Sequence, residues 1–397
     1  MKNYLKSLLL LLCVASCETP QQEVNSLVLA NHHVPLAKAQ IIAQNPRLGE
    51  IIGFKNPSNK TAKLPTNTHK LDSTIVVAEQ TDTLLYIFTY EKGGFCIISA
   101  DDRHRPILAY SENSKFELQG ANAGIINWFD VQSKGILAIK KGEIQPDAAN
   151  NFLWQRLLHL SGLPANNTTC AGQPIAIESI GLNSTLISTT TVGPLLQTTW
   201  GQGCGYNDLL NAGCSSNCGR QLTGCVATSM AQVMRRWSKP TNYNWASMPN
   251  NQGSPEVSRL MRDAGVNAVM NYGCEASGTN HDKAANALRN NFGYTSAVLQ
   301  NYNYSTVRDN LFYGQPVILG GCHTRNSFLG ITTGYDQCHS WVCDGYIQSV
   351  YCEYSTLLFH MNWGWNSWCD GWFVFDNWGN GAGRNYQYAK DMIVNIR

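Results

Sequence analysis

A single cysteine at the start of a predicted helix is the residue best placed to act as a nucleophile. Cys225 follows Gly224, and apolar side chains then recur at helical spacing through Trp237. The apolar positions are Val226, Met230, Val233, Met234 and Trp237. The positive end of a helix dipole favours a thiolate near neutral pH, and the thiolate is the reactive form of cysteine. The alternative is a small buried apolar residue, the common role of a helix cysteine.

A cysteine nucleophile needs a base, and imidazole suits that task near pH 7. The strand-rich last part of the chain offers His323, His339 and His360. We favour His339, because it begins an apolar strand after a loop. Its competitor is His360.

An orienting group for the imidazole is expected on the next strand of a predicted hairpin. There Asn362 would accept a hydrogen bond from the imidazole N–H, and Trp363 would shield that bond from water. His360 lies two residues before Asn362 and shares its face of the strand, which keeps it in competition with His339. Acyl transfer also needs a donor for the oxyanion, and both Gln202 and Gln221 lie upstream of the cysteine. The sequence alone does not choose between these two glutamines.

Composition narrows the class of protein. The chain has 397 residues, enough for two or three domains, with 29 Lys and Arg against 27 Asp and Glu. This near neutrality argues against a nucleic-acid partner. The 34 Gly, 11 Trp and 17 Tyr suggest a compact, aromatic-rich exported protein.

The N-terminus predicts export. Residues 1–16 combine Lys2 and Lys6 with a short leucine-rich run, as in a secretory signal peptide that is too short to span a membrane permanently. The residues before Cys17 are similar to a bacterial lipobox, in which the cysteine becomes the lipidated first residue. We therefore expect a lipoprotein at the cell envelope or surface, with ordinary cleavage near Ser16 as the alternative. A lipid anchor would then be the only link to a membrane.

The remaining cysteines suggest disulfides. Fourteen cysteines less Cys13 and Cys17 leave twelve in the exported part, where disulfides are permissible. If Cys225 stays free, eleven remain and at least one more is unpaired. A zinc cluster of Cys204, Cys214 and Cys218 is disfavoured, because the spacing lacks the paired short knuckles of common zinc sites.

The elements that must position these residues fall into two halves. The first half predicts a helix at 34–44, strands at 83–90, 95–100 and 106–110, and one or two helices at 123–141, which is a small α+β domain. Residues 161–191 have a linker composition, without Lys or Arg. The second half predicts helices at 225–237, 255–270, 281–291 and 305–313, the last with Ser305 as N-cap, followed by strands at 316–320, 339–347, 357–363 and 372–375. Helices first and an antiparallel sheet second is again α+β.

Several motifs in this order resemble the streptopain-type cysteine peptidases, a bacterial branch of the papain-like fold. They begin at Gln202-Gly203 and Tyr206-Asn207, and continue at Thr223–Thr228 and Ala231–Met234. The later ones are His339 with Val342 and Asp344-Gly345, then Asn362-Trp363-Gly364-Trp365, then Asp370-Gly371. The resemblance implies Cys225 as nucleophile, His339 as general base and acid, Gln202 as oxyanion donor, and Asn362 with Trp363 as imidazole support. It implies protein or peptide substrates and neither a metal nor an organic cofactor, and it makes His360 structural.

The first half resembles the inhibitory prosegment of the same family, through residues 93–102 and 107–111. The expected organisation is a signal peptide at 1–16, a prodomain at 18–160 that inhibits its own enzyme, a processed linker at 161–191, and a catalytic domain at 192–397. Residues 379–383 are similar to the family's mobile loop beside the cleft.

Two features depart from the family pattern. Cys338 stands before the catalytic histidine, where we expect a glycine, and the catalytic part has many extra cysteines. Cys338 would either crowd the site or offer redox control. The alternatives to a peptidase are an inactive surface binding lipoprotein on the same fold, and a related thiol amidase or transpeptidase.

Overall fold

The computed structural model describes residues 32–53, 69–117, 123–170, 173–176, 186–328, 331–351, 354–374 and 388–397. Its contacts divide the chain into two compact units. Unit 1 takes Met1–Asn113, Gln132–Thr191 and Ile347–Leu358, and unit 2 takes Ser114–Val131, Val192–Tyr346 and Phe359–Arg397. The signal peptide, Cys17 and residues 379–383 lie outside the described residues.

Unit 1 contains four consecutive antiparallel strands in the order β1-β2-β3-β4. They are β1 (Leu71–Glu79), β2 (Asp82–Tyr90), β3 (Phe95–Ser99) and β4 (Ile107–Ser111). The last three confirm the predicted strands. β1 was not predicted, because its first residues are polar and mostly exposed. The turn between β2 and β3 requires Gly94, since a Cβ there would lie 2.6 Å from the carbonyl oxygens of Ser111 and Glu112.

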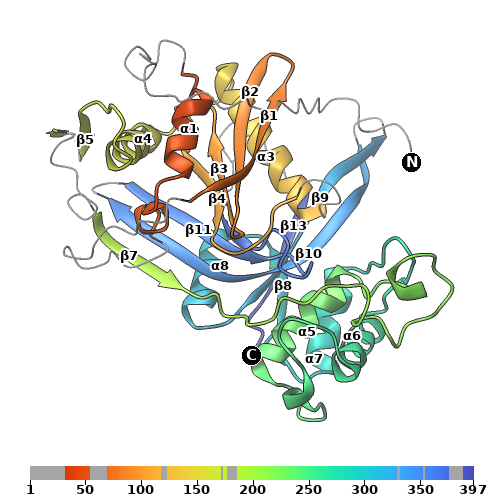
Figure 1. The fold of residues 1–397 in the computed structure, drawn as a ribbon. Helices are drawn as coiled ribbons and strands as arrows, with labels where there is room; N and C mark the ends of the chain where they lie inside the picture. Colours follow the sequence, from red (N-terminus) through yellow and green to blue (C-terminus); the bar gives the residue numbers. More distant parts are fainter. Residues whose placement is uncertain are drawn as a thin grey trace. The chain divides into compact units, whose positions relative to one another are not determined.

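Short helices accompany this sheet. The helix α1 (Leu36–Ala43) confirms the first predicted helix, and it packs with the strands into one core (Figure 1). The helices α2 (Leu48–Ile51) and α4 (Ala148–Leu160) were not predicted. α4 begins at Asp147, whose side chain accepts a hydrogen bond from the backbone N–H of Ala149 at 2.9 Å.

The segment predicted as a linker contains three short strands. They are β5 (Thr168–Cys170), β6 (Gln173–Ile175) and β7 (Leu186–Val192). Within unit 1, Thr189 Oγ1 lies 3.2 Å from Ser349 Oγ, and Thr191 Oγ1 donates to the carbonyl oxygen of Gly53 at 3.1 Å. Threonine favours strands, so a composition that is typical of linkers also suits β7.

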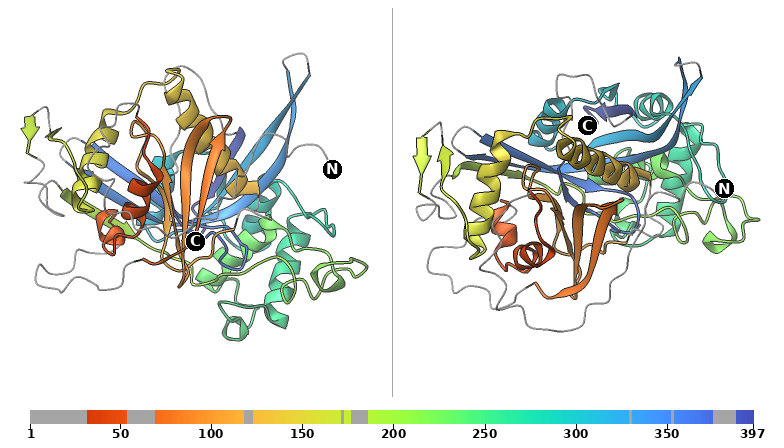
Figure 2. Two further views of the ribbon diagram at one scale, coloured as in Figure 1. Left: turned by 45° about the horizontal axis from the view of Figure 1, so that its top comes forward. Right: turned by 90° about the horizontal axis from the view of Figure 1, so that it is seen from above.

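From Val192 onward, unit 2 begins with a helical part. It contains α5 (Cys225–Trp237), α6 (Pro255–Asn267), α7 (His281–Asn290) and α8 (Tyr304–Phe312), all close to their predicted ranges. The green-to-teal helices α5, α6 and α7 lie together in both views of Figure 2, and they share one buried core. The predicted cap of α8 is wrong: Asn303 is the N-cap and accepts from the N–H of Thr306, so Ser305 lies inside the helix.

The strands of unit 2 follow the order β12-β11-β10-β9-β13-β8. They are β8 (Val298–Asn301), β9 (Val317–Phe328), β10 (Ile331–Tyr351), β11 (Tyr354–Asn362), β12 (Gly371–Phe373) and β13 (Tyr388–Val394). The end of β10 and the beginning of β11, within Ile347–Leu358, belong to unit 1. β9, β10, β11 and β12 confirm the predicted strands, whereas β8 and β13 were not predicted. In the antiparallel pairing of β10 with β9, His339 lies opposite Gly321 and Ser340 opposite Gly320. Mixed helix and antiparallel sheet is the α+β class expected from the sequence.

Residues 114–131, from the first half of the sequence, are built into unit 2. They include the start of α3 (Ala123–Lys140), which confirms a single helix in the predicted range. The buried Trp128 donates from Nε1 to the carbonyl oxygen of Val374 at 2.8 Å and meets Phe373 edge-on. The carbonyl oxygen of Lys115 accepts from the N–H of Cys369 at 2.8 Å.

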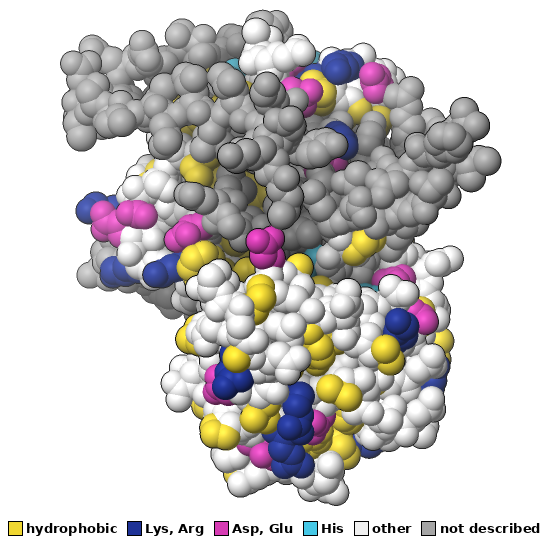
Figure 3. Space-filling model, turned by 90° about the vertical axis from the view of Figure 1, so that its right-hand side faces the viewer, with side chains coloured by type: hydrophobic (Ala, Val, Ile, Leu, Met, Phe, Trp, Pro, Cys, Tyr) yellow, Lys and Arg dark blue, Asp and Glu magenta, His cyan; other side chains and the backbone are white. Residues whose placement is uncertain are grey.

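The described surface carries few charges. On the face shown in Figure 3, basic and acidic side chains are interspersed, and much of the visible surface is uncharged. This agrees with 14% charged residues in the sequence. Among the described residues, no helix has the length and hydropathy needed to cross a bilayer.

Candidate active site

Cys225 is the first residue of α5 and carries a free, half-buried thiol. The preceding Gly224 has a φ of +85°, and a Cβ on it would lie 2.8 Å from the carbonyl oxygen of Ser277. Only glycine fits both conditions without strain. The glycine therefore fixes how the chain enters the helix and where the thiol sits.

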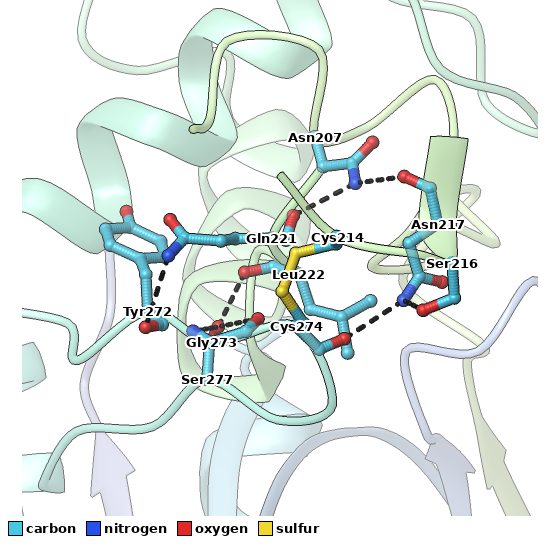
Figure 4. Close-up of a disulfide and its surroundings, with 10 residues drawn as sticks. All are labelled: Asn207, Cys214, Ser216, Asn217, Gln221, Leu222, Tyr272, Gly273, Cys274 and Ser277. Atoms are coloured by element: carbon cyan, nitrogen blue, oxygen red, sulfur yellow. Dashed lines mark hydrogen bonds between the residues drawn. A yellow bond between two sulfur atoms is a disulfide. The ribbon is translucent and has the colours of Figure 1, made fainter. Parts of the chain in front are cut away.

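A disulfide-braced loop leads into this helix. Cys214 is bonded to Cys274, and Cys204 to Cys218. Figure 4 shows Asn207 Nδ2 donating to the carbonyl oxygens of Asn217 and Gln221. Ser277 Oγ donates to the carbonyl oxygen of Leu222 at 2.7 Å, only three residues before the thiol. This network holds the approach to Cys225 rigidly.

The same disulfides remove the zinc alternative. Cys204, Cys214 and Cys218 are all oxidised in pairs, so none offers a thiolate ligand. Among the described residues, no group of three or more His, Cys, Asp or Glu side chains is arranged to hold a metal ion. Besides Cys225, the free cysteines among the described residues are Cys96, Cys343 and Cys369, all buried.

The thiol of Cys225 is neutral in this state of the chain. Burial raises its pKa, while backbone hydrogen bonds from Ser340, Val226 and Cys225 itself lower it by less. In this arrangement desolvation of the sulfur outweighs the backbone hydrogen bonds that would stabilise a thiolate. The three hydrogen bonds nevertheless mark where a thiolate would be stabilised.

His339 lies buried on β10 and carries a neutral imidazole. Burial lowers its pKa to about 4, with a smaller contribution from the charge of His281, and the hydrogen bond to Trp363 opposes the shift. Its Nε2 lies 3.1 Å from the carbonyl oxygen of Trp363, so this nitrogen is the protonated donor. The ring stacks beside Trp341, with centroids 6.0 Å apart and planes 13° apart.

Asn362 and Trp363 meet His339 differently from the expectation. The Oδ1 of Asn362 accepts from Gln232 Nε2 at 2.9 Å and from the N–H of Gly364 at 3.2 Å, and its Nδ2 donates to the carbonyl oxygen of Thr198. Both lone pairs of Oδ1 are therefore occupied. In the described contacts, the imidazole of His339 is bonded to the backbone of Trp363 in place of the Asn362 side chain.

The position of the Trp363 backbone is fixed from its other side. Its N–H donates to Asp370 Oδ1 at 2.8 Å, and its fully buried ring lies 5.0 Å from that of Trp341. Burial raises the pKa of Asp370 to about 7, and the bond from Trp363 lowers it by less. The carbonyl that holds His339 is thus part of a tightly packed segment.

The structure distinguishes the two candidate oxyanion donors. Gln202 is 9% exposed, and its Nε2 is buried without a hydrogen-bond partner among the described residues. Its carbonyl oxygen accepts from the N–H of Thr223 at 3.0 Å, which anchors it two residues before Cys225. The amide of Gln221 instead donates to the carbonyl oxygen of Tyr272 (Figure 4). Gln202 is therefore the available donor.

His360 is a paired histidine. Its Nδ1 lies 2.6 Å from Asp344 Oδ1, and its ring meets Trp372 edge-on. Burial opposes its charge, but the carboxylate of Asp344 raises the pKa of His360 overall. The Asp344 carboxylate also accepts from the N–H of Leu196 at 2.9 Å. These contacts connect β10 and β11 to the segment of unit 2 that begins at Val192.

Cys338 is bonded to Cys322 on the neighbouring strand, directly before His339. The position where we expected a glycine is therefore half of a cross-strand disulfide, and the thiol is not free beside the imidazole.

Sequence reasoning missed several polar residues of the site. Gln232 binds Asn362, Thr198 and the backbone of Trp200. It could have been noticed, because it lies one heptad after Cys225 on the helix face that also carries Thr228 and Ser229. Trp341, His281 and Asp391 gave no comparable signal, since only tertiary packing brings β10, α7 and β13 together.

Comparison with known proteins assigns both halves of the chain. A model of the peptidase C10 family matches residues 200–242 and 239–373, and a model of the Spi protease inhibitor matches residues 53–136. The thiol protease/hemagglutinin PrtT of Porphyromonas gingivalis is 25% identical in an alignment of 412 residues that covers 91% of this chain and 42% of PrtT. Streptopain of Streptococcus pyogenes is 25% identical in an alignment of 447 residues that covers 94% of this chain and 96% of streptopain.

A solved structure is similar over most of the chain. A fragment of Prevotella intermedia prointerpain A matches with a TM-score of 0.52 and 26% identity, covering 80% of this chain and 97% of the fragment. The chain thus spans less than half of PrtT but nearly all of streptopain and of the prointerpain fragment.

Proposed function

Because this chain belongs to the peptidase C10 family and is a cysteine peptidase with its own inhibitory prosegment, we propose that it is an endopeptidase whose nucleophile is Cys225. We further propose that residues 18–160 form the prodomain, that processing occurs within 161–191, and that residues 192–397 form the active enzyme. Its substrates are proteins or peptides.

The first half of the reaction forms an acyl-enzyme. His339 takes the thiol proton, and the Cys225 sulfur attacks the scissile carbonyl carbon. The Gln202 Nε2 and the backbone N–H of Cys225 donate to the resulting oxyanion. The imidazolium then protonates the leaving amine as the C–N bond breaks, which leaves a thioester.

Water completes the cycle. The neutral His339 accepts a proton from water as the water oxygen attacks the thioester carbonyl. The C–S bond breaks, and the carboxylic acid leaves with the thiol restored. His339 returns the proton that it took from water to the Cys225 sulfur as the C–S bond breaks, which restores the thiol. The carbonyl oxygen of Trp363 accepts from His339 Nε2–H and orients the imidazole during this cycle. Asn362 fixes the neighbouring backbone by accepting from the N–H of Gly364.

The full-length chain is a resting form in this proposal. A raised pKa at Cys225 and a pKa of about 4 at His339 keep both groups neutral at pH 7. The His339 Nε2–H is committed to the carbonyl oxygen of Trp363. With Nε2 protonated, Nδ1 is the free base of His339, and it is the nitrogen that takes the thiol proton during catalysis.

The observation that carries the proposal is the unpartnered Nε2 of Gln202. A buried donor without a partner costs about 1–3 kcal/mol, so it is rare unless a ligand supplies the missing acceptor. Its backbone is bonded to Thr223, two residues before the thiol. A developing oxyanion on a carbonyl attacked by Cys225 is such an acceptor.

The test is a Cys225→Ala variant of the full-length chain, with Cys343→Ala as matched control because Cys343 is also a free cysteine. We expect the control to lose its prosegment, digest casein and react with an epoxide-type thiol-peptidase probe. The Cys225→Ala variant should do none of these. Normal self-processing of purified Cys225→Ala would contradict autocatalysis, and casein cleavage by it would contradict the nucleophile.

Two further measurements separate the alternatives. An inactive binding lipoprotein would leave Cys225 unlabelled by the probe in processed protein. An amidase or transpeptidase would give casein digests without internal peptide-bond cleavage, or with joined products. Mapped cleavage sites between ordinary residues would support an endopeptidase.

We also propose that the chain is exported and anchored by a lipid on Cys17, with the mature domain released by processing. The support is the residue pattern of 1–17. Mass spectrometry of the mature N-terminus tests it. A lipidated Cys17 is the expected result, and an unmodified terminus near residue 17 would favour ordinary signal cleavage.

A further inference from the structure

A second histidine lies on the other side of Ser340 from the candidate active site. His281 is the first residue of α7 and is 7% exposed. Its Nδ1 lies 2.7 Å from Asp391 Oδ1, and its Nε2 lies 2.8 Å from Ser340 Oγ. With Nδ1 protonated toward the carboxylate, Nε2 accepts from the hydroxyl. Asp391, His281 and Ser340 thus form one chain of hydrogen bonds.

Strand register brings the members of this chain together. Gly320 of β9 lies opposite Ser340 on β10 and opposite Asp391 on β13. A Cβ on Gly320 would lie 2.5 Å from both Asp391 Oδ1 and His281 Cε1. The missing side chain at Gly320 is therefore the space that the imidazole and carboxylate occupy.

The chain of hydrogen bonds reaches the nucleophile through the backbone of Ser340, which is hydrogen-bonded to the Cys225 thiol. Ser229 Oγ, 3.4 Å from Ser340 Oγ, separately donates to the carbonyl oxygen of Cys225 at 2.9 Å. A hydrogen bond to a charged acceptor is about twice as strong as a neutral one, so the bond from Ser340 to the sulfur strengthens when the thiol ionises.

We propose that His281 and Asp391 are positioning residues for the Cys225 thiolate: by gripping the Ser340 hydroxyl, they hold the Ser340 N–H against the sulfur. The proposal rests on Cys225 being the nucleophile. The contacts that hold the Ser340 hydroxyl come from four elements of unit 2, namely α7, β9, β10 and β13. Alternation along β10 leaves His339 on the opposite face, free to serve as the base.

The test measures the reaction of the Cys225 thiol itself. Full-length chains are alkylated with iodoacetamide from pH 5 to the highest pH at which the fold is retained, and modification of the Cys225 peptide is followed by mass spectrometry. The variants are His281→Ala, His281→Gln, Ser340→Ala and, as control, Asn280→Ala. Asn280 precedes His281 at the same helix end, and its side chain makes no capping hydrogen bond.

We expect His281→Ala and Ser340→Ala to shift the pH profile of alkylation upward by about one unit, since only the thiolate reacts and loss of one charge-assisted hydrogen bond is of this size. Alkylation is then about tenfold slower at pH 6, and the rate of the fully ionised thiol is unchanged. His281→Gln retains an atom that can bond the Ser340 hydroxyl and should recover most of the rate. Asn280→Ala should match the wild type.

Two results would overturn the proposal. One is an unchanged pH profile in both His281→Ala and Ser340→Ala. The other is an unshifted profile with slower alkylation of the fully ionised thiol, which indicates general loosening of the site. If His281→Ala fails to fold in thermal unfolding, Ser340→Ala decides, because it removes one hydroxyl and keeps the N–H. Alkylation measures the reactivity of the Cys225 thiol and does not depend on peptidase turnover. The proposed function is tested separately, because peptidase activity retained by Cys225→Ala would refute it.

Discussion

Replacing Gln202 with leucine should separate catalysis from stability at this position. The Nε2 of Gln202 has no partner among the described residues, whereas its backbone carbonyl is bonded to Thr223. Leucine keeps the backbone contact and an apolar stem but removes the unpaired donor. The variant should therefore fold at least as well as the wild type and lose activity.

The expected changes in stability and in kcat follow from what the Gln202 amide contacts in the resting chain and in the transition state. In the resting chain, removing a buried unpartnered donor should raise the free energy of unfolding by about 1 kcal/mol. In the transition state the same donor faces an oxyanion, and its loss should reduce kcat by about 100- to 1000-fold. KM should change little, because the bond forms mainly as the charge develops.

The assays are urea unfolding of the full-length chain and kinetics of the processed enzyme on a fluorogenic peptide. Gln221→Leu is the matched control, since the Gln221 amide is bonded to Tyr272 and lies outside the proposed oxyanion site. Its stability should change by less than about 1 kcal/mol, because the substitution removes one 3.5 Å bond together with a buried Oε1 that has no partner among the described residues, and kcat should stay within threefold. The reasoning is refuted if Gln202→Leu is destabilised by more than 1 kcal/mol while its kcat stays near wild type.

Three other perturbations have defined outcomes. Replacing Cys322 and Cys338 together by serine should cost about 3 kcal/mol in urea unfolding, because the disulfide closes a loop with a sequence separation of 16; an unchanged midpoint would count against a stabilising role. The pKa of His339 is about 4 in the folded chain and 6.5 in the unfolded chain, so the unfolded chain binds this proton more tightly. The free energy of unfolding should therefore fall by about 3 kcal/mol as the pH drops from 6.5 to 4. His339→Gln should show a smaller dependence of stability on pH in this range, and an equal dependence would refute the prediction. Trp128→Ala should lower the free energy of unfolding of the full-length chain by about 3–5 kcal/mol, and a loss below 1 kcal/mol would contradict its packing.

The sequence predicted the elements with strong periodicity. The cysteine helix begins and ends at the predicted residues, and the apolar strands at β2, β3, β9, β10 and β11 were expected. The α+β class is confirmed by the structure, and the resemblance to streptopain with its inhibitory prosegment is confirmed by the family matches and the prointerpain structure. These features depend on local pattern, which a single sequence contains.

What the sequence did not reveal depends on contacts between distant segments. β13 was missed, yet it supplies Asp391, which meets His281 across 110 residues. The choice between Gln202 and Gln221 needed the partner of each amide. The contact of His339 with a backbone carbonyl, in place of the Asn362 side chain, also has no local signature. Register and side-chain partners are set by tertiary packing, so only the structure supplies them.

The packing of segment 114–131 predicts that activation needs a second step after cleavage of the chain between the two halves. It lies within the match to the Spi protease inhibitor, yet it packs into unit 2 through Trp128 and Lys115. A cut between 161 and 191 severs the chain and leaves these contacts in place. Full activity should therefore follow dissociation of the cut fragment and rise on dilution, as in a complex of two separate molecules. A processed sample kept concentrated would then be cleaved but still inhibited.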